Sequence, residues 1–231
     1  MKPQPQPPDR RPLSQADDPA SVLRDAEIPY RFGSGSDSDS DLAEATRCFV
    51  QSLNSESIPH VLVGALAMLQ YVDGRTTRDI DLIIALEDLD RLPGFQLEER
   101  NEWFATGTVG PLRVDLLFTA NPLFALVLEQ HSELRDFLDG KLNCATPKGI
   151  ILLKLFALPS LYRQGNVQRA ALYETDILQL LHSQPTEAEA LLSVLKNHMP
   201  PSDINALSDV LSDIQQRIDH QSRFDQPTPE N

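Results

Sequence analysis

Two acidic residues of one predicted strand, Asp79 and Asp81, are the residues of this chain best suited to chemistry. Side chains alternate between the faces of a strand, so both carboxylates point the same way while Ile80 and Leu82 face the core. Adjacent like charges raise a carboxyl pKa unless a cation lies between them. Carboxylate oxygens are ligands that Mg²⁺ prefers, with phosphate oxygens and water completing its shell. The pattern predicts a divalent-cation site, although a solvated edge strand with incidental acids has the same pattern.

A third acid, Asp115, lies on a second predicted strand, residues 112–118. Val114 and Leu116 share the apolar face of that strand, so Asp115 projects from the opposite face. If the two strands are neighbours, three carboxylates converge on one patch. Three acids around two metal ions suit in-line phosphoryl or nucleotidyl transfer. Taken alone, Asp115 also fits an ordinary surface position.

The strand predicted at 59–63 ends at Gly64, and strong helix formers follow from Ala65. A glycine at such a turn lets the backbone approach a phosphate, and the start of a helix presents free N–H groups. One glycine after a strand is weak evidence alone. It gains weight because it precedes Asp79 by 15 positions, which leaves room for a short helix and a return strand.

In combination, these residues resemble the nucleotidyltransferases with a DNA polymerase β-like fold. The resemblance covers residues 59–181 and is closest to a small bacterial branch that includes the AbiEii-type toxins, where a string like that at 75–81 is typical. Its signature is a glycine turn followed by an Asp-x-Asp strand and a third Asp on a neighbouring strand, here Gly64-Ala65, Asp79-Ile80-Asp81 and Asp115. The family usually has Gly or Ser at the position of Ala65, which lacks a hydroxyl.

The resemblance implies a set of roles. Asp79, Asp81 and Asp115 would hold Mg²⁺ or Mn²⁺, and Asp115 would also accept the proton of the acceptor hydroxyl. The expected nucleotide-binding residues are Gly64, Ala65, Arg75, Arg78, Lys154 and Asp176.

Four of these nucleotide-binding assignments have alternatives. Arg75 and Arg78 flank the acid pair, where they either bind phosphate or acceptor or neutralise the carboxylates. Lys154 lies in an apolar helical stretch, where the alternative to phosphate binding is a side chain that extends to the surface. Asp176, with Arg169 seven positions earlier on roughly the same helix face, is equally compatible with a structural ion pair or a solvated face.

The expected fold class is α+β: a small mixed β-sheet nucleotidyltransferase core with helices, followed by a C-terminal helical unit. Residues 86–101 are expected to form a short surface helix and loop, and 102–118 a hairpin. Helices are predicted at 41–54, 65–71, 123–130, 146–157, 167–182, 187–198 and 203–221. The predicted organisation is a disordered Pro/Ser/Asp-rich tail at 1–39, the α/β core at 40–120, the helical domain at 121–222 and a disordered tail at 223–231.

The charge balance restricts the partners of this 231-residue chain, whose formal net charge is −14. A basic stripe that could follow a nucleic-acid backbone is absent, which argues against extended DNA binding but leaves a local RNA contact open. No apolar run approaches the ~20 residues that span a bilayer, and residues 1–30 contain no apolar leader. We therefore expect a cytoplasmic protein without a membrane partner.

The expected function is transfer of a nucleoside monophosphate from an NTP to a hydroxyl acceptor. An RNA 3′ end, a protein hydroxyl or a small molecule would all suit such a site. The nearest relatives also suggest a toxin with an antitoxin partner. The alternative is a catalytically inactive nucleotide-binding or regulatory module, which Ala65 favours. A scaffold that binds partners through the tail at 1–39 is a third possibility.

Overall fold

The structure, a computed structural model, describes residues 37–72, 77, 79–137 and 140–224. Arg75 and Arg78 lie outside the described residues, as do nearly all residues of the two predicted tails. None of the helices in the described part has the length and apolar character needed to cross a lipid bilayer.

A seven-stranded mixed sheet forms the centre of the molecule, which confirms the α+β class. Its spatial order is β3-β4-β5-β2-β1-β7-β6. The β2/β5 and β1/β7 pairs are parallel, and the remaining pairs are antiparallel. The strands are β1 (His60–Val63), β2 (Asp79–Ile84), β3 (Gln96–Arg100), β4 (Phe104–Val109), β5 (Leu112–Phe118), β6 (Ser132–Phe137) and β7 (Gly140–Ala145).

The central strands carry the apolar side chains of the core. Every residue of β1 is buried, and in β2 only Asp79 and Asp81 are partly exposed. The edge strand β3 is exposed along its whole length and carries charged residues, which disfavour pairing with another chain. The two acids therefore lie on a rigid, buried part of the sheet rather than on a solvated edge strand.

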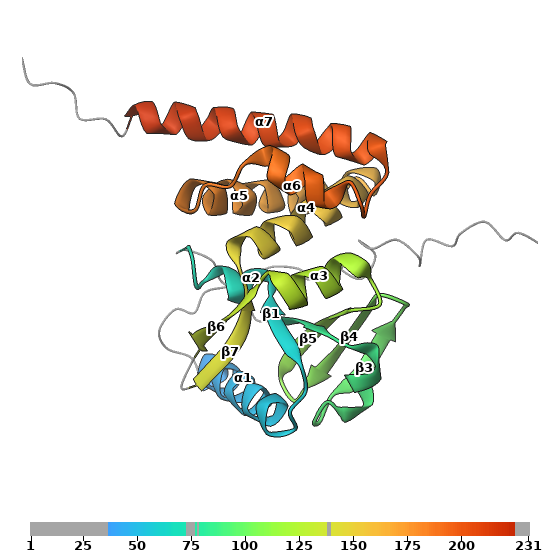
Figure 1. Cartoon of the computed structure of the whole chain (residues 1–231). Helices are drawn as coiled ribbons and strands as arrows, with labels where there is room; N and C mark the ends of the chain where they lie inside the picture. Colours follow the sequence, from blue (N-terminus) through green and yellow to red (C-terminus); the bar gives the residue numbers. More distant parts are fainter. Residues whose placement is uncertain (1–36, 73–76, 78, 138–139, 225–231) are drawn as a thin grey trace, which may run out of the picture.

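Helices surround the sheet on two sides (Figure 1). Helices α4 to α7 are stacked on one side of the molecule, and α1 lies on the opposite side. The helices are α1 (Asp37–Ser55), α2 (Gly64–Met68), the 3₁₀-helix η2 (Leu86–Arg91), α3 (Pro122–Gln130), α4 (Pro147–Arg163), α5 (Val167–Ser183), α6 (Ala188–Leu195) and α7 (Pro201–Phe224).

Local sequence explains where α4 and α5 begin. Thr146 is the N-cap of α4: its side chain accepts a hydrogen bond from the N–H of Gly149, and Pro147 occupies the first turn. Asn166 caps α5 in the same way through the N–H of Arg169. These caps fix the positions at which both helices start above the sheet.

The predicted boundary at residue 120 does not coincide with the end of the sheet. Residues 132–145, which we placed in the helical domain, form β6 and β7, and β7 pairs with β1 through Leu62 and Cys144. The helix-and-loop prediction for 86–101 was also incomplete, because 96–100 form β3. The three strands β3, β6 and β7 contain no Val, Ile or Thr. In addition, β7 pairs with the distant β1, and β3 pairs with β4 in an irregular register, so local pattern did not reveal these strands. Helix α1 starts at Asp37, inside the predicted tail.

Candidate functional site

The three predicted acids lie on two neighbouring strands of the sheet. Strands β2 and β5 pair in parallel, with Asp81 opposite Asp115 and Asp79 opposite Arg113. Asp115 is buried with 5% of its surface exposed, whereas Asp79 and Asp81 are partly exposed. The topology thus brings Asp81 and Asp115 to facing positions, with Asp79 two residues away on the same face of β2.

Burial and mutual repulsion make these carboxyl groups poor acids. Burial raises the pKa of Asp81 to about 7, and the charges of Asp115 and Asp79 add to this effect. Burial also raises the pKa of Asp115 to about 6, although Arg113 opposes the change. Burial raises the pKa of Asp79, and the charges of Arg113 and Arg169 oppose part of this rise. Burial therefore outweighs the nearby cations of the described residues in setting the pKa values of these carboxyl groups.

Within the described residues, Arg113 is the cation that forms an ion pair with one of these acids. Its Nε lies 3.4 Å from Oδ1 of Asp115, which is long for a charge-assisted hydrogen bond. Within the described part of the chain, both atoms are buried without a hydrogen-bond partner. Sequence reasoning missed Arg113, although strand alternation places it on the same face as Asp115 and so contained the necessary signal.

Gly64 has two separate reasons to be glycine. Its φ of +65° lies in the left-handed region that side chains disfavour. In addition, a Cβ placed on Gly64 would lie 1.9 Å from Oδ2 of Asp81, because β1 and β2 pair Val63 with Asp81. The turn between β1 and α2 and the Asp81 carboxylate are therefore in direct contact, with Ala65 next in the chain. This contact was not part of the sequence prediction, which treated the glycine and the acid as separate features.

The donor chemistry at Asp81 and Asp115 fits a divalent cation. Both supply hard carboxylate oxygens, Asp115 Oδ1 has no hydrogen-bond partner in the described residues, and burial raises the pKa of both carboxyl groups. No group of three or more His, Cys, Asp or Glu side chains among the described residues is close enough to hold one ion jointly. The facing pair, with Asp79 beside it, is thus the part of the site that suits a cation.

Lys154 and Asp176 form a buried ion pair. Nζ of Lys154 is 2.8 Å from Oδ2 of Asp176, and the two residues are 6% and 0% exposed. The same ammonium lies 4.2 Å from the ring centroid of Tyr173. Of the alternatives for Asp176, the structure shows the ion pair. The pair joins α4 to α5, and the charge of Lys154 lowers the pKa of Asp81.

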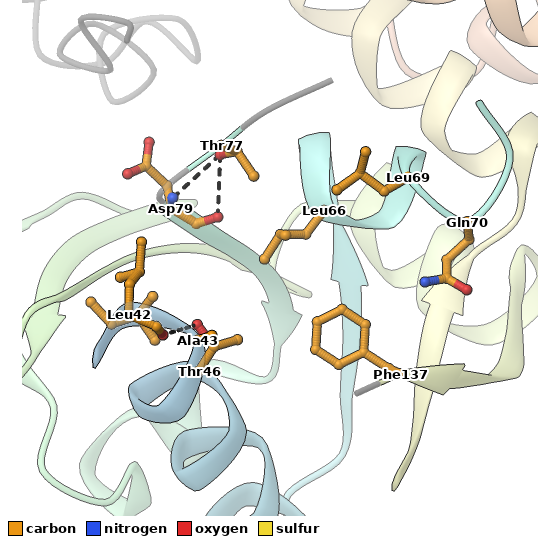
Figure 2. A pocket seen from close by; sticks show the side chains of 10 residues that line it. Leu42, Ala43, Thr46, Leu66, Leu69, Gln70, Thr77, Asp79 and Phe137 are labelled. Atoms are coloured by element: carbon orange, nitrogen blue, oxygen red, sulfur yellow. Dashed lines mark hydrogen bonds between the residues drawn. The ribbon is translucent and has the colours of Figure 1, made fainter. Parts of the chain in front are cut away.

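A cavity of about 220 Å³ lies between α1, α2 and the sheet. Figure 2 shows its walls: side chains such as Leu66 and Phe137 face it, while the Asp79 carboxylate at its rim points away from them. The hydroxyl of Thr77 at the same rim accepts a hydrogen bond from the N–H of Asp79 at 3.3 Å. The cavity is lined by Leu42, Ala43, Thr46, Leu66, Leu69, Gln70, Thr77, Asp79, Leu112 and Phe137.

Comparisons with known proteins give a fold but no close relative. No protein-family model matches the chain, and no curated protein matches it in sequence. The solved structure of ANT(2'')-Ia in complex with adenylyl-2''-tobramycin is similar to this chain, with a TM-score of 0.51 and 14% identity over 68% of this chain and 95% of that one. This likeness shows that the chain has a nucleotidyltransferase fold.

Two more distant similarities accompany it. One is to an antigenic nucleotidyltransferase-like protein from Paracoccidioides brasiliensis, with a TM-score of 0.46 and 15% identity over 74% of this chain and 93% of that chain. The other is to the Megavirus polyadenylate synthase, with a TM-score of 0.43 and 14% identity over 71% of this chain and 41% of that chain.

Proposed function

We propose that this chain transfers a nucleoside monophosphate from an NTP to a hydroxyl acceptor. The observation that carries the proposal is the register that sets Asp81 opposite Asp115 while Gly64 holds the chain turn against the Asp81 carboxylate. An acid pair beside a glycine turn, in a nucleotidyltransferase fold, suits phosphoryl-group chemistry.

In the proposed reaction the acceptor oxygen forms a bond to the α-phosphorus, the bond from that phosphorus to the β-phosphate bridge breaks, and pyrophosphate leaves. Asp115 accepts the proton of the acceptor hydroxyl, as a carboxylate within reach of that hydroxyl can. Asp81 and Asp115, with Asp79 beside them, would bind Mg²⁺ or Mn²⁺, which would neutralise the negative charge that develops on phosphate oxygens.

The turn at Gly64 and Ala65 would bind the NTP through backbone N–H groups. Gly64 is suited to this because the backbone at that position carries no side chain. Ala65 offers its N–H but no hydroxyl, which favours the alternative of an inactive nucleotide-binding module. An assay that finds NTP binding without pyrophosphate release would support that alternative.

For the acceptor, we favour a small hydroxylated molecule over a long RNA. The formal net charge of −14 opposes an extended polyanion. ANT(2'')-Ia, the similar protein above, was solved with an adenylylated tobramycin, so an aminoglycoside is a reasonable first acceptor to test. A toxin role rests on the string at 75–81 alone. It would require growth arrest on expression and relief by a small partner protein.

The decisive experiment is transfer of label from α-labelled NTPs, with Mg²⁺ or Mn²⁺, to a panel of acceptors. Asp81→Asn should abolish labelling without changing the fold. Asp136→Asn is a matched control, because Asp136 is also a strand aspartate but is exposed on β6, away from the site. Undiminished labelling by the Asp81→Asn protein would contradict the proposal.

A further inference from the structure

Arg113 lies among the three acids of the candidate site. It is directly opposite Asp79 of β2, and Asp115 follows two positions later on the same face of β5. On its other side, across the β4/β5 pair, the residue opposite Arg113 is the uncharged Thr108. Apart from Arg113 and Asp115, β5 is apolar. The strand register thus places a permanent positive charge inside a group of carboxylates.

The contact between Arg113 and Asp115 is an ion pair without a hydrogen bond. Nε of Arg113 lies 3.4 Å from Oδ1 of Asp115, and within the part of the chain that the structure describes both atoms are buried and lack a hydrogen-bond partner. A residue that orients a carboxylate does so by donating a hydrogen bond to it. Because that bond is not made here, the interaction is mainly the attraction between two charges.

A second arginine of the sheet, Arg135, shows the same spacing with a longer acid. Arg135 and Glu133 are also two positions apart, on β6, and Arg135 donates to Oε1 of Glu133 from Nε at 3.0 Å and from Nη2 at 2.5 Å. Glu133 reaches the guanidinium because its side chain has one methylene group more than that of an aspartate. The shorter Asp115 does not reach Arg113, so its Oδ1 remains available to another cation.

We propose that Arg113 is a counter-ion built into the acid site that opposes binding of a free divalent cation and favours binding of that cation as a complex with a triphosphate. This inference rests on the proposed function. A free cation at Asp115 would share the carboxylate with a guanidinium of like charge, and like charges repel most where water is largely excluded. A cation bound to a triphosphate carries net negative charge with it, which Arg113 attracts. Arg113 is therefore a residue that determines specificity rather than a catalytic residue.

The test is calorimetric titration of the full chain with Mn²⁺ alone and with the Mn²⁺ complex of inorganic tripolyphosphate. Arg113→Met should tighten binding of Mn²⁺ alone about 10-fold, because a positive charge beside the carboxylates is removed, and should not tighten binding of the complex. Arg113→Lys keeps the charge without the planar donor group, so it should bind both probes like the wild type. Arg113→Gln should behave like Arg113→Met and takes its place if the methionine variant does not fold.

Arg135→Met is the matched control, because Arg135 is also a strand arginine two positions from an acid, but lies on the edge strand β6. It should leave the affinity for both probes unchanged. Equal or weaker binding of Mn²⁺ alone by Arg113→Met would overturn the inference and leave the proposed function standing, since weaker binding would mean that Arg113 orients Asp115.

Two further results would also count against the role of Arg113. Equal gains in affinity for both probes would remove the preference for the complex, and equal gains in Arg113→Met and Arg135→Met would reflect net charge alone. A wild-type protein that binds neither probe and transfers no label from any NTP would overturn both proposals.

Discussion

Two groups of charged side chains in this molecule are organised in opposite ways. In the Lys154–Asp176 pair, opposite charges meet at 2.8 Å and neutralise each other. Across β2 and β5, three carboxylates lie together, and Arg113 at 3.4 Å from Asp115 compensates them only in part. The pKa values of Asp81 and Asp115 are raised, to about 7 and about 6. Under the proposed function, the ion pair stabilises the fold and the acid group binds a ligand.

The largest expected effect is a loss of activity when one of the three acids, Asp79, Asp81 or Asp115, is replaced. Asp81→Asn should lower nucleotidyl transfer by about 10³-fold or more, since interactions that stabilise developing charge account for losses of this size. Its free energy of unfolding should stay equal or rise, because one of the repelling charges is gone. Labelling assays and urea denaturation of the same preparation test both parts. A variant that lost stability and activity together would place Asp81 with the structural group.

The second expected effect is a loss of stability when the Lys154–Asp176 ion pair is broken. Lys154→Met removes the cation 2.8 Å from the fully buried carboxylate of Asp176, so the free energy of unfolding should fall by about 3–5 kcal/mol. The double variant Lys154→Met/Asp176→Leu should lose less than Lys154→Met alone, because the buried carboxylate is removed together with its cation. A double-mutant cycle by urea denaturation measures this. Additive losses in the cycle would show that the two residues are not coupled.

The third effect is local, at the turn that contacts Asp81. Gly64→Ala should destabilise the protein by about 1–3 kcal/mol more than Gly165→Ala, because of crowding against Asp81. Gly165 is a matched control, since its φ of +70° is similar but nothing lies within 4 Å of an added Cβ. Adding Asp81→Ala should restore part of the loss in Gly64→Ala. Thermal denaturation of the wild type, Gly64→Ala, Gly165→Ala and Gly64→Ala/Asp81→Ala measures these differences. Equal losses of stability at both glycines would contradict the explanation by crowding against Asp81.

A fourth expected effect is a pH dependence of the stability of the metal-free protein. The folded state binds protons at Asp81 more tightly than the unfolded state, so stability should fall as pH rises from about 4, the ordinary pKa of an aspartate, through about 7. Mg²⁺ should reduce this fall. Melting temperatures in EDTA and in Mg²⁺, at pH 5 and pH 8, test the effect. In Asp81→Asn the slope should be shallower, and an unchanged slope would assign the titration to other groups.

The arrangement of the acids was more predictable than the contacts that surround them. Strand alternation predicted that Asp79, Asp81 and Asp115 lie on the faces opposite their apolar neighbours, such as Ile80 and Val114. Their meeting depended on β2 and β5 being neighbours, which the structure shows. The contact of Gly64 with Asp81 arises from pairing across β1 and β2, and periodicity within one strand contains no information about it.

The helical side was harder to predict, for a different reason. Lys154 and Asp176 lie 22 positions apart on two helices, and a lysine in an apolar stretch has the same local pattern whether it pairs, extends to solvent or binds phosphate. Packing of α4 on α5 selects among these arrangements. Similarly, β7 pairs with a strand about 80 positions earlier in the chain, and no local signal indicates such a partner.

The pairing of β7 with β1 also determines how much chain the sheet needs. If synthesis stopped after residue 120, β1 would be an unprotected edge of four buried residues, open to pairing with another molecule. The shortest chain that completes this side of the sheet extends to Ala145, the end of β7. Helix α4 begins two residues later, at Pro147. On the ribosome, the strand that carries Gly64 at its end would wait for about 80 further residues before its second neighbour emerged.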